Sequence, residues 1–470
     1  MQKKRIGYLV YIMIVLGICL LPLLAMGLRT DVGNRENRTP APWPSLYKED
    51  GFNWEYLQEA GDYFTDHFAF RQELVSADAR IRTELFAVSP VDSVIVGKNG
   101  WLYYAATLDD YQHKDSVSER MLFNMAHNLA LMQEYTQLLG KTFLFTVAPN
   151  KNSLYGDDMP NRLNYQFGEN SDMERLEPWL EREKVNYVDL YELFRSQDEV
   201  LYYARDSHWN QKGAVLVCNA LLDTAGREHE TYEEIALQRT TDYLGDLNLM
   251  LFPVMANPEE QIRYQKEFTW EYSQGDDVED NFIQTTCENG KGSLLLYRDS
   301  FGNSMIPYLA EEFQTATFSK QVPYPMTDLV TCDPDLVIVE RVERHLPTLG
   351  RVPPLMSGLA RFPEGEKSVV ESAATLHFSK QGSYWKMEGL ADAAYMETDS
   401  RIYLEVEDAA GPKTYEAFCV GLSDDGTEDY GYLMYLSEIL LEGDTFHIRV
   451  MTEKDDQMLI LYDEEIQAGE

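Results

Sequence analysis

The sequence predicts an α/β fold in which a parallel sheet is flanked by helices, with an N-terminal transmembrane helix and a smaller C-terminal β-sandwich domain. Three observations predict this arrangement. Buried-strand patterns alternate with helical patterns through the middle of the chain. A long uncharged apolar run lies near the start of the chain. After about Pro363, short strand patterns separated by Gly and Asp turns replace the helical periodicity.

The individual elements follow from the spacing of apolar residues. We expect helical structure over 64–86 and a hairpin over 94–104, around the turn residues Asn99 and Gly100. The elements expected after the hairpin are a helix over 116–139, a strand over 142–147, a helix over 173–184, a strand over 185–190, a helix over 211–225, a strand over 294–297, a helix over 302–312 and a strand over 336–339. Ligands of such sheets bind beyond the carboxyl ends of the strands. We therefore expect a site in the loops after the strands that end near 148, 297 and 340.

Size and charge limit the classes of function. A chain of 470 residues is too long for one ordinary core and indicates two folded domains with appendages. Its 79 acidic and 40 basic residues give a formal net charge of −39. This charge opposes binding of polyanions, because each phosphate contact requires a local cation. Nucleic acid is therefore not expected as a partner, and a neutral glycan fits more easily than an anionic polymer.

Cysteine usage indicates neither a metal site nor a dense disulfide framework. The five cysteines lie far apart and form no CxxC pair; they are Cys19, Cys218, Cys287, Cys332 and Cys419. One or two disulfides are an alternative in an oxidising compartment, but buried free thiols are favoured. No spacing typical of metal ligands is present elsewhere, so we expect no metal.

The N-terminus predicts the compartment. Lys3, Lys4 and Arg5 precede an uncharged run over 6–28, which at a rise of about 1.5 Å per residue is long enough for a bilayer core of roughly 30 Å. Basic residues stay on the cytoplasmic side, which predicts a single-pass membrane protein whose remaining chain is extracytoplasmic. Cleavage after a small-residue site at 25–27 is the alternative and would release a secreted protein.

These patterns divide the chain into four parts. We expect a transmembrane signal-anchor over 1–29, a polar, proline-bearing linker over 30–50, an α/β domain over 51–363 and a β-sandwich over 364–470. The β-sandwich has two interpretations, a carbohydrate-binding domain and a packing or assembly module. An exposed Trp385 and several tyrosines would suit stacking on sugars, although tyrosine is also an ordinary strand residue.

Ser300 follows a hydrophobic strand and precedes a predicted helix. A serine at such a turn projects its hydroxyl from the edge of the sheet, where backbone N–H groups and the helix N-terminus can stabilise an oxyanion. The alternative is an N-cap serine, which would also follow a strand and begin a helix.

A serine nucleophile needs a base that a third group holds in place. Asp206 and His208 lie two residues apart in a predicted loop, so the carboxylate can reach one imidazole nitrogen while the other faces a substrate. The alternative is an N-cap Asp206 and a structural histidine before the helix that begins at Gln211. The other candidates, His67 and His345, are more readily explained as structural.

The sequence resembles a known family at these positions. The segment 297–304 (YRDSFGNS), preceded by 206–210 (DSHWN), resembles the AlgX/AlgJ-type SGNH-hydrolase-like acetyltransferases and the related DHHW proteins. Further matching stretches are 66–71, 97–103, 148–151 with Tyr155, 245–247 and 340–346. The resemblance covers about 51 to 349 and implies an SGNH-like catalytic domain over 51–363.

The resemblance implies a role for each motif residue. Ser300 would be the nucleophile, His208 the general base and then the general acid, and Asp206 the carboxylate that orients it. The positions implied to contact substrate are Lys151, Arg344, Asn303, Arg298 and Trp209. A salt bridge to Glu340 or Glu343 is the alternative for Arg344. Arg298 stands where the alginate enzymes have glycine, and Ser207 stands where the second residue of the DHHW name is histidine.

The sequence therefore predicts a serine-dependent O-acetyltransferase that acts by a ping-pong mechanism on hydroxyls of a cell-surface polysaccharide or exopolysaccharide, without a cofactor. Acetyl-CoA is cytoplasmic, so the resemblance implies a membrane-bound O-acyltransferase as the partner that donates acetyl groups across the membrane. Two alternatives remain. One is a carbohydrate acetylesterase, in which water is the acceptor, and the other is a noncatalytic glycan-binding assembly protein.

Overall fold

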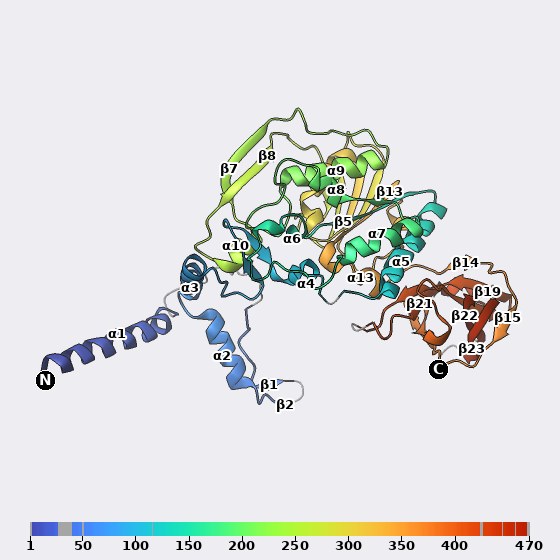
Figure 1. The fold of residues 1–470 in the computed structure, drawn as a ribbon, viewed down its shortest axis with the longest axis horizontal. Coiled ribbons are helices and arrows are strands. Elements are labelled where there is room, and N and C mark those ends of the chain that lie inside the picture. The colour runs from blue at the N-terminus through green and yellow to red at the C-terminus, as the bar shows by residue number, and fades with distance from the viewer. Residues whose placement is uncertain are drawn as a thin grey trace.

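A computed structural model describes residues 2–26, 40–48, 51–114, 116–423, 426–443, 445–455 and 457–467 (Figure 1). The first helix, α1, spans Gln2–Met26. No helix in these ranges is both long and apolar enough to cross a membrane. The membrane span expected over 6–28 stays a prediction, and its last two residues lie outside the described ranges, as do residues 30–39, 49 and 50 of the expected linker.

A seven-stranded sheet forms the centre of the α/β domain. Its strands are β5 (Thr142–Ala148), β6 (Tyr187–Val188), β9 (Glu271–Gln274), β10 (Phe282–Thr286), β11 (Ser293–Tyr297), β12 (Thr315–Ser319) and β13 (Leu336–Val342). They lie in the order β6-β5-β13-β11-β12-β10-β9. The strands from β6 to β12 are parallel, whereas β10 and β9 continue the sheet in antiparallel pairing. The mixed α/β fold with a parallel sheet is therefore confirmed, and β9, β10 and β12 are additions that the sequence patterns did not predict.

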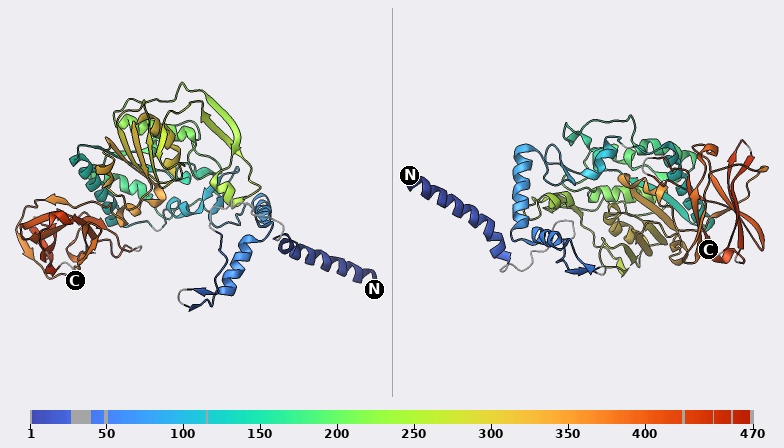
Figure 2. Two further views of the ribbon diagram at one scale, coloured as in Figure 1. Left: turned by 180° about the vertical axis from the view of Figure 1, so that it is seen from behind. Right: turned by 90° about the horizontal axis from the view of Figure 1, so that it is seen from below.

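Helices cover both faces of this sheet (Figures 1 and 2). The four longest are α5 (Glu119–Leu138), α7 (Asp172–Arg182), α9 (Gln211–Thr224) and α11 (Ile306–Glu312). Successive strand residues point to opposite faces. Leu294 and Leu296 of β11 consequently pack with α9 and α11, and Leu295 and Tyr297 pack with α5 and α7. Burial on both faces explains why this strand reads as a continuous hydrophobic run.

Further helices and strands precede the C-terminal unit. They are β1 (Tyr47–Lys48), β2 (Gly51–Phe52), α2 (Tyr56–His67), α3 (Arg71–Phe86), β3 (Val94–Val96), β4 (Leu102–Tyr104), α4 (Leu108–Tyr111), α6 (Lys151–Leu154), α8 (Leu190–Arg195), β7 (Leu237–Tyr243), α10 (Asp246–Leu251), β8 (Glu259–Tyr264), α12 (Asp328–Thr331) and α13 (Thr348–Arg351). The hairpin expected over 94–104 is confirmed, because β3 and β4 pair antiparallel. The helical structure expected over 64–86 is present as two helices, because Phe70 has a φ of 67° and separates α2 from α3.

The C-terminal unit, residues 359–467, contains two sheets. Its strands are β14 (Leu359–Arg361), β15 (Lys367–Val369), β16 (His377–Gln381), β17 (Tyr384–Leu390), β18 (Ile402–Asp408), β19 (Gly411–Glu416), β20 (Phe418–Val420), β21 (Gly431–Ser437), β22 (Thr445–Lys454) and β23 (Gln457–Gln467). One sheet has the order β14-β19-β18-β22-β23-β15 and the other β16-β17-β21-β20. Leu404 and Ile448 of the first sheet share a hydrophobic core with Met387 and Met434 of the second. Trp385 is not exposed as expected; it is half-buried and stacks on Phe378, with 4.9 Å between ring centroids.

The C-terminal unit packs beside α5 (Figures 1 and 2). Four polar residues of this helix, which we call the α5 junction, are buried against or near it: Arg120, Asn124, His127 and Asn128. Asn128 donates hydrogen bonds to the backbone oxygens of Leu349 and Cys419, at 3.0 and 2.9 Å. The backbone N–H of Cys419 donates to the Asn128 side chain in return. Polar contacts as well as apolar packing therefore hold the two folded parts together.

The cysteines described after α1 are free thiols, as favoured from the sequence: Cys218, Cys287, Cys332 and Cys419. All but Cys332 are buried. Burial raises the pKa of the Cys218 and Cys419 thiols, which keeps both protonated and poorly nucleophilic.

Candidate active site

Ser300 lies between the end of β11 and a short helical turn. The turn is a 3₁₀ helix over Phe301–Ser304, and the Ser300 side chain makes no capping hydrogen bond to it. The neighbouring Asp299 fixes the turn instead: its carboxylate accepts hydrogen bonds from the N–H of Phe301 at 3.0 Å and of Val342, which ends β13, at 2.7 Å. Ser300 therefore stands at the N-cap position of this turn without capping it, and its hydroxyl remains available at the carboxyl end of the sheet.

Asp206 and His208 occupy the loop that precedes α9. Asn210, and not Asp206, caps that helix by accepting a hydrogen bond from the N–H of Gly213 at 3.1 Å. Asp206 instead accepts a hydrogen bond from the backbone N–H of His208, at 2.8 Å. The loop thus curls around the Asp206 carboxylate and directs the imidazole away from α9.

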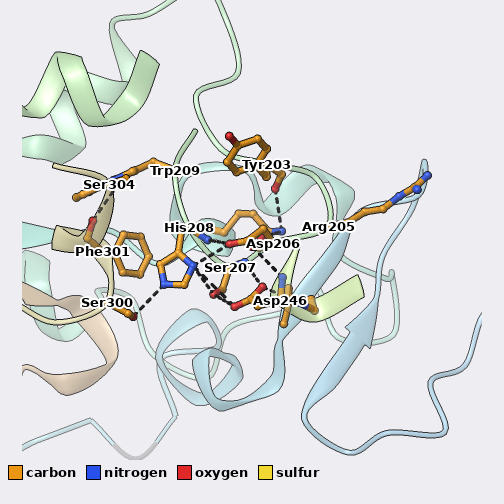
Figure 3. Close-up of polar contacts among 12 residues, drawn as sticks. Tyr203, Arg205, Asp206, Ser207, His208, Trp209, Asp246, Ser300, Phe301 and Ser304 are labelled. Atoms are coloured by element: carbon orange, nitrogen blue, oxygen red, sulfur yellow. Dashed lines mark hydrogen bonds and ion pairs between the residues drawn. The ribbon is translucent and has the colours of Figure 1, made fainter. Parts of the chain in front are cut away.

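The structure brings the side chains of Ser300, His208 and Asp206 into one hydrogen-bonded row (Figure 3). His208 Nε2 lies 2.9 Å from Ser300 Oγ, and His208 Nδ1 lies 2.8 Å from Asp206 Oδ1. Because a carboxylate only accepts, Nδ1 carries the proton toward Asp206 and Nε2 is free to accept the serine proton. Both distances are within the reach required for proton transfer.

The Asp206 carboxylate is buried, and both of its oxygens accept hydrogen bonds. Its second oxygen accepts hydrogen bonds from the Tyr243 hydroxyl at 2.9 Å and from the backbone N–H of Asp246 at 2.8 Å. Burial alone would raise the pKa of Asp206, but its hydrogen bonds and the nearby imidazole outweigh burial and hold the pKa well below the ordinary value. Asp206 therefore stays ionised.

Asp246 places a second carboxylate beside the imidazole. Its Oδ2 lies 3.8 Å from His208 Nδ1 and accepts a hydrogen bond from the Ser207 hydroxyl at 2.5 Å. Burial disfavours the imidazolium form, but Asp206 and then Asp246 overcome it and raise the pKa of His208 above 6.5. Neither Tyr243 nor Asp246 was predicted as a site residue; the only signal for Asp246 was its place in the matching stretch 245–247.

Asp206, His208 and Asp246 are also close enough together to be considered as metal ligands, with one donor atom of each within 4.8 Å of the others. Their atoms already have partners. Each carboxylate accepts hydrogen bonds through both oxygens, and His208 faces Asp206 on one side and Ser300 on the other. The arrangement therefore suits proton transfer.

Lys151, expected to contact substrate, is buried and supports the Asp206 loop. Its ammonium donates to the backbone oxygens of Tyr203, Ala204 and Asp206 at 3.2, 3.1 and 2.6 Å. Burial lowers its pKa to about 8. Because all three hydrogen bonds of its ammonium go to one loop, Lys151 holds the loop that carries Asp206 in position.

Arg298 and Trp209 are also internal, contrary to expectation. Each is 1% exposed. Arg298 donates to the backbone oxygens of Val278 and Asp280, both at 2.9 Å, and to the side chain of Asn303. Trp209 packs in the core, and its indole N–H donates to the Ser304 hydroxyl at 2.7 Å. The aliphatic part of the Arg298 side chain fills space that Gly302 leaves open, since a Cβ at Gly302 would lie 2.7 Å from the Cβ of Arg298.

Two of the predicted substrate residues, Arg344 and Asn303, remain partly accessible. The Arg344 guanidinium lies against two aromatic rings. Its guanidinium carbon lies 5.8 Å from the ring centroid of Phe301, the neighbour of Ser300, and 5.4 Å from that of Tyr104. Among the described residues it forms no ion pair with Glu340 or Glu343, so the salt-bridge alternative is wrong. Arg344 thus lies against the ring of Phe301, the residue after Ser300, and is ion-paired to neither of these glutamates.

Comparison with known proteins gives one family match. Residues 94–285 match the model described as "SGNH hydrolase-like domain, acetyltransferase AlgX". This match confirms the resemblance seen in the motifs; it contains Asp206 and His208 and ends before Ser300. No curated protein matches the chain at a significant level.

Several solved structures are similar at low sequence identity. PatB1 from Bacillus cereus is 14% identical, with 54% of this chain and 96% of that chain covered and a TM-score of 0.43. A DHHW family protein from Eubacterium siraeum is 13% identical, with coverages of 54% and 91% and a TM-score of 0.41. The O-acetyltransferase domain of Pseudomonas putida AlgJ is 15% identical, with coverages of 54% and 92% and a TM-score of 0.37.

Proposed function

We propose that this protein, whose residues 94–285 match the SGNH hydrolase-like domain model of the acetyltransferase AlgX, is an O-acetyltransferase. It would use Ser300 to move acetyl groups onto hydroxyls of an extracytoplasmic polysaccharide. The observation that carries the proposal is the row from Ser300 Oγ through His208 to Asp206. A hydroxyl is a weak nucleophile on its own, and this row supplies its base and the group that orients the base.

The first half-reaction forms an acetyl-enzyme. His208 Nε2 takes the proton from Ser300 Oγ as the oxygen attacks the carbonyl carbon of an acetyl ester. The tetrahedral intermediate collapses when the donor's C–O bond breaks, and His208 gives its proton to the departing alcohol. Asp206 stabilises the transient imidazolium, which its low pKa favours. Arg344, beside Phe301, is the cation best placed to stabilise the developing negative charge.

The second half-reaction reverses these roles. His208 deprotonates a sugar hydroxyl, the resulting oxygen attacks the Ser300 acetyl ester, and the serine leaves with the proton returned from His208. The product is an O-acetylated sugar and the free enzyme. The same row would serve hydrolysis if water replaced the sugar, so the acceptor that enters the site decides between transferase and esterase chemistry.

The wider setting is part of the proposal. Acetyl-CoA is cytoplasmic, so an extracytoplasmic enzyme needs an acetyl group carried across the membrane, and a membrane-bound O-acyltransferase is the proposed donor. We further propose that the C-terminal unit is a β-sandwich whose main role is to brace the α/β domain. Its polar contacts with α5 and the inward packing of Trp385 support bracing over carbohydrate binding.

The proposal is tested with purified wild-type protein and the Ser300→Ala, His208→Gln and Ser304→Ala variants. An aryl acetate serves as donor, with and without an oligosaccharide. We expect the first two variants to lose acetyl transfer by a factor of about 10³ or more, and Ser304→Ala, a hydroxyl on the same turn, to retain it. A serine-reactive sulfonyl or phosphonate reagent should label only Ser300. Undiminished transfer by folded Ser300→Ala would exclude the serine mechanism, and acetate release unaffected by sugar would indicate an esterase.

A further inference from the structure

Glu259 contacts the loop that carries Asp206, although it takes no part in the row from Ser300 to Asp206. It is the first residue of β8, and its side chain is half-buried. One carboxylate oxygen accepts a hydrogen bond from the backbone N–H of Ala204 at 2.9 Å, and the other accepts one from that of Arg205 at 3.0 Å. Both oxygens of Glu259 are therefore bound to the two residues that precede Asp206.

Lys151 binds the other end of the same peptide groups. Its ammonium donates to the backbone oxygens of Tyr203 and Ala204. The oxygen of Tyr203 and the N–H of Ala204 belong to one peptide group, and the oxygen of Ala204 and the N–H of Arg205 belong to the next. In a trans peptide group the C=O and N–H bonds point in opposite directions. Two consecutive peptide groups are therefore each held between Lys151 and Glu259.

The charges of the two side chains match the peptide dipoles that they bind. The ammonium faces the negative, carbonyl end of each peptide group, and the carboxylate faces the positive, N–H end. Burial lowers the pKa of Lys151 to about 8 and raises the pKa of Glu259 above 4.5, and each charge opposes the shift of the other. Hydrogen bonds to charged groups are roughly twice as strong as those between neutral groups. The pair therefore restrains this part of the loop more firmly than neutral side chains would.

The strand paired with β8 contacts Asp206 itself. Tyr243, the last residue of β7, lies opposite Glu259 in the pairing of the two strands. The Tyr243 hydroxyl donates to the Asp206 carboxylate, and its ring stacks on that of Tyr203 with 4.0 Å between the ring centroids. One end of the β7–β8 pair therefore binds both the catalytic carboxylate and the two peptide groups that precede it.

We propose that Glu259 is a positioning residue, which together with Lys151 fixes the peptide groups before Asp206 and so holds the Asp206 carboxylate within hydrogen-bonding distance of His208. Without this restraint the loop gains freedom, and the hydrogen bond of 2.8 Å between His208 Nδ1 and Asp206 Oδ1 weakens. The inference rests on the proposed function, because the restraint serves catalysis only if His208 is the base for Ser300.

The test measures the pKa of His208 by NMR in the full-length protein with isotope-labelled histidine, and compares Glu259→Gln with Lys151→Met. Gln offers one acceptor oxygen where two are used, and Met offers no donor. Burial lowers the pKa of His208 and Asp206 raises it, so displacement of Asp206 should lower that pKa by about one unit in both variants. With an aryl acetate, kcat should fall about tenfold and KM should stay unchanged.

The direction of the shift separates positioning from a simple effect of charge. Loss of a negative charge alone would lower the pKa of His208, whereas loss of a positive charge alone would raise it. Displacement of the loop lowers it in both variants. Asp246 and Arg344, the other charged groups that influence the imidazole, are the same in both. If Lys151→Met does not fold, Glu259→Asp replaces it; this variant keeps the charge but is one methylene shorter, so only displacement lowers the pKa of His208.

Glu260→Gln is the matched control, because Glu260 is exposed on the same strand and pairs with Arg239. Its His208 pKa and its kcat should equal those of wild type. Opposite shifts in Glu259→Gln and Lys151→Met, an unchanged His208 pKa in Glu259→Gln, or an unchanged His208 pKa in Glu259→Asp where that variant is used, would overturn the inference. The outcome is separable from that of the proposed function, because the NMR titration needs no turnover. Acetyl transfer that survives Ser300→Ala would end the serine mechanism and leave the titration intact.

Discussion

Two carboxylates influence His208, and their geometry gives them different effects. Asp206 hydrogen bonds directly to Nδ1 at 2.8 Å and so sets the tautomer and the direction of the ring. Asp246 lies 3.8 Å from the same nitrogen and is held there by Ser207. Asp246 therefore acts mainly through its charge, which adds to the rise in the pKa of His208.

Replacement of Asp246 by Asn should shift the pH dependence of catalysis. His208 must be neutral to accept the Ser300 proton, so kcat/KM rises as pH increases through the His208 pKa, which lies above 6.5. Removing the Asp246 charge lowers that pKa, and the rising limb should move down by about one pH unit. A kcat/KM profile with an aryl acetate measures this shift. Asp242→Asn, an exposed carboxylate on β7, is the control; a limb that does not move in Asp246→Asn would contradict the assignment.

At this scale the sequence motifs identified the residues that now lie in one row, since each stands in a short contiguous pattern. They did not identify Tyr243, because its hydroxyl meets Asp206 only after a distant hairpin folds back. They misplaced Lys151 and Arg298, because charged motif residues suggest a solvent-facing site. Both side chains instead satisfy backbone oxygens inside the fold.

At the scale of elements, most of the predicted strands of the sheet are those buried on both faces, and the short edge strand β6 lies within the strand predicted over 185–190. The strands β5, β11 and β13 read as hydrophobic runs for this reason. The last two strands of the sheet, β10 and β9, are polar and follow no helix. Their place is set by the pairing of β10 with β12 and of β9 with β10, and not by local pattern. The predicted helix over 302–312 is also shorter, because a 3₁₀ turn precedes α11.

The first residues of α10 pack closely against the loop that carries Asp206. For this reason Gly245, which precedes α10, is sensitive to substitution. A Cβ at this position would lie 2.5 Å from the backbone oxygen of Arg205 and 2.8 Å from the Cβ of Asp206. Gly245→Ala should displace Asp206 and lower kcat by about 10-fold to 100-fold, because small misplacements of catalytic groups are costly. Steady-state kinetics test this effect. Gly61→Ala, where a Cβ has open space, should behave as wild type; the idea fails if Gly245→Ala does so too.

At the scale of the whole molecule, a buried charge network joins the two folded parts. His127 of the α5 junction lies between Glu183 of the α/β domain, at 2.9 Å, and Glu416 of the C-terminal unit, at 3.2 Å. Arg361 bridges Glu416 and Glu134, at 2.5 and 2.6 Å. Burial disfavours the protonated form of His127, but the two carboxylates prevail and raise its pKa above 6.5.

The stabilising effect of His127 should depend on pH. Because its pKa is higher in the folded than in the unfolded chain, its contribution is complete below about pH 6.5 and is lost as pH rises through the folded value. His127→Gln should therefore reduce the free energy of unfolding most at acidic pH, by about 3 kcal/mol, and progressively less toward alkaline pH. Chemical denaturation of wild type and variant over this range measures the difference. His377→Gln, at an exposed position, should show no such trend; a constant deficit across the range for His127→Gln would count against the charged network.

The α5 junction also determines what proteolysis would leave behind. Loss of the C-terminal unit after cleavage would expose the buried face of α5, because Arg120 and Asn128 would lose the backbone oxygens of Ser400 and Cys419 to which they now donate. The same helix carries the apolar side chains that cover one face of the sheet under Ser300. We therefore expect removal of the C-terminal unit by a protease to reduce activity without changing any catalytic side chain, because the packing of α5 against the sheet would weaken.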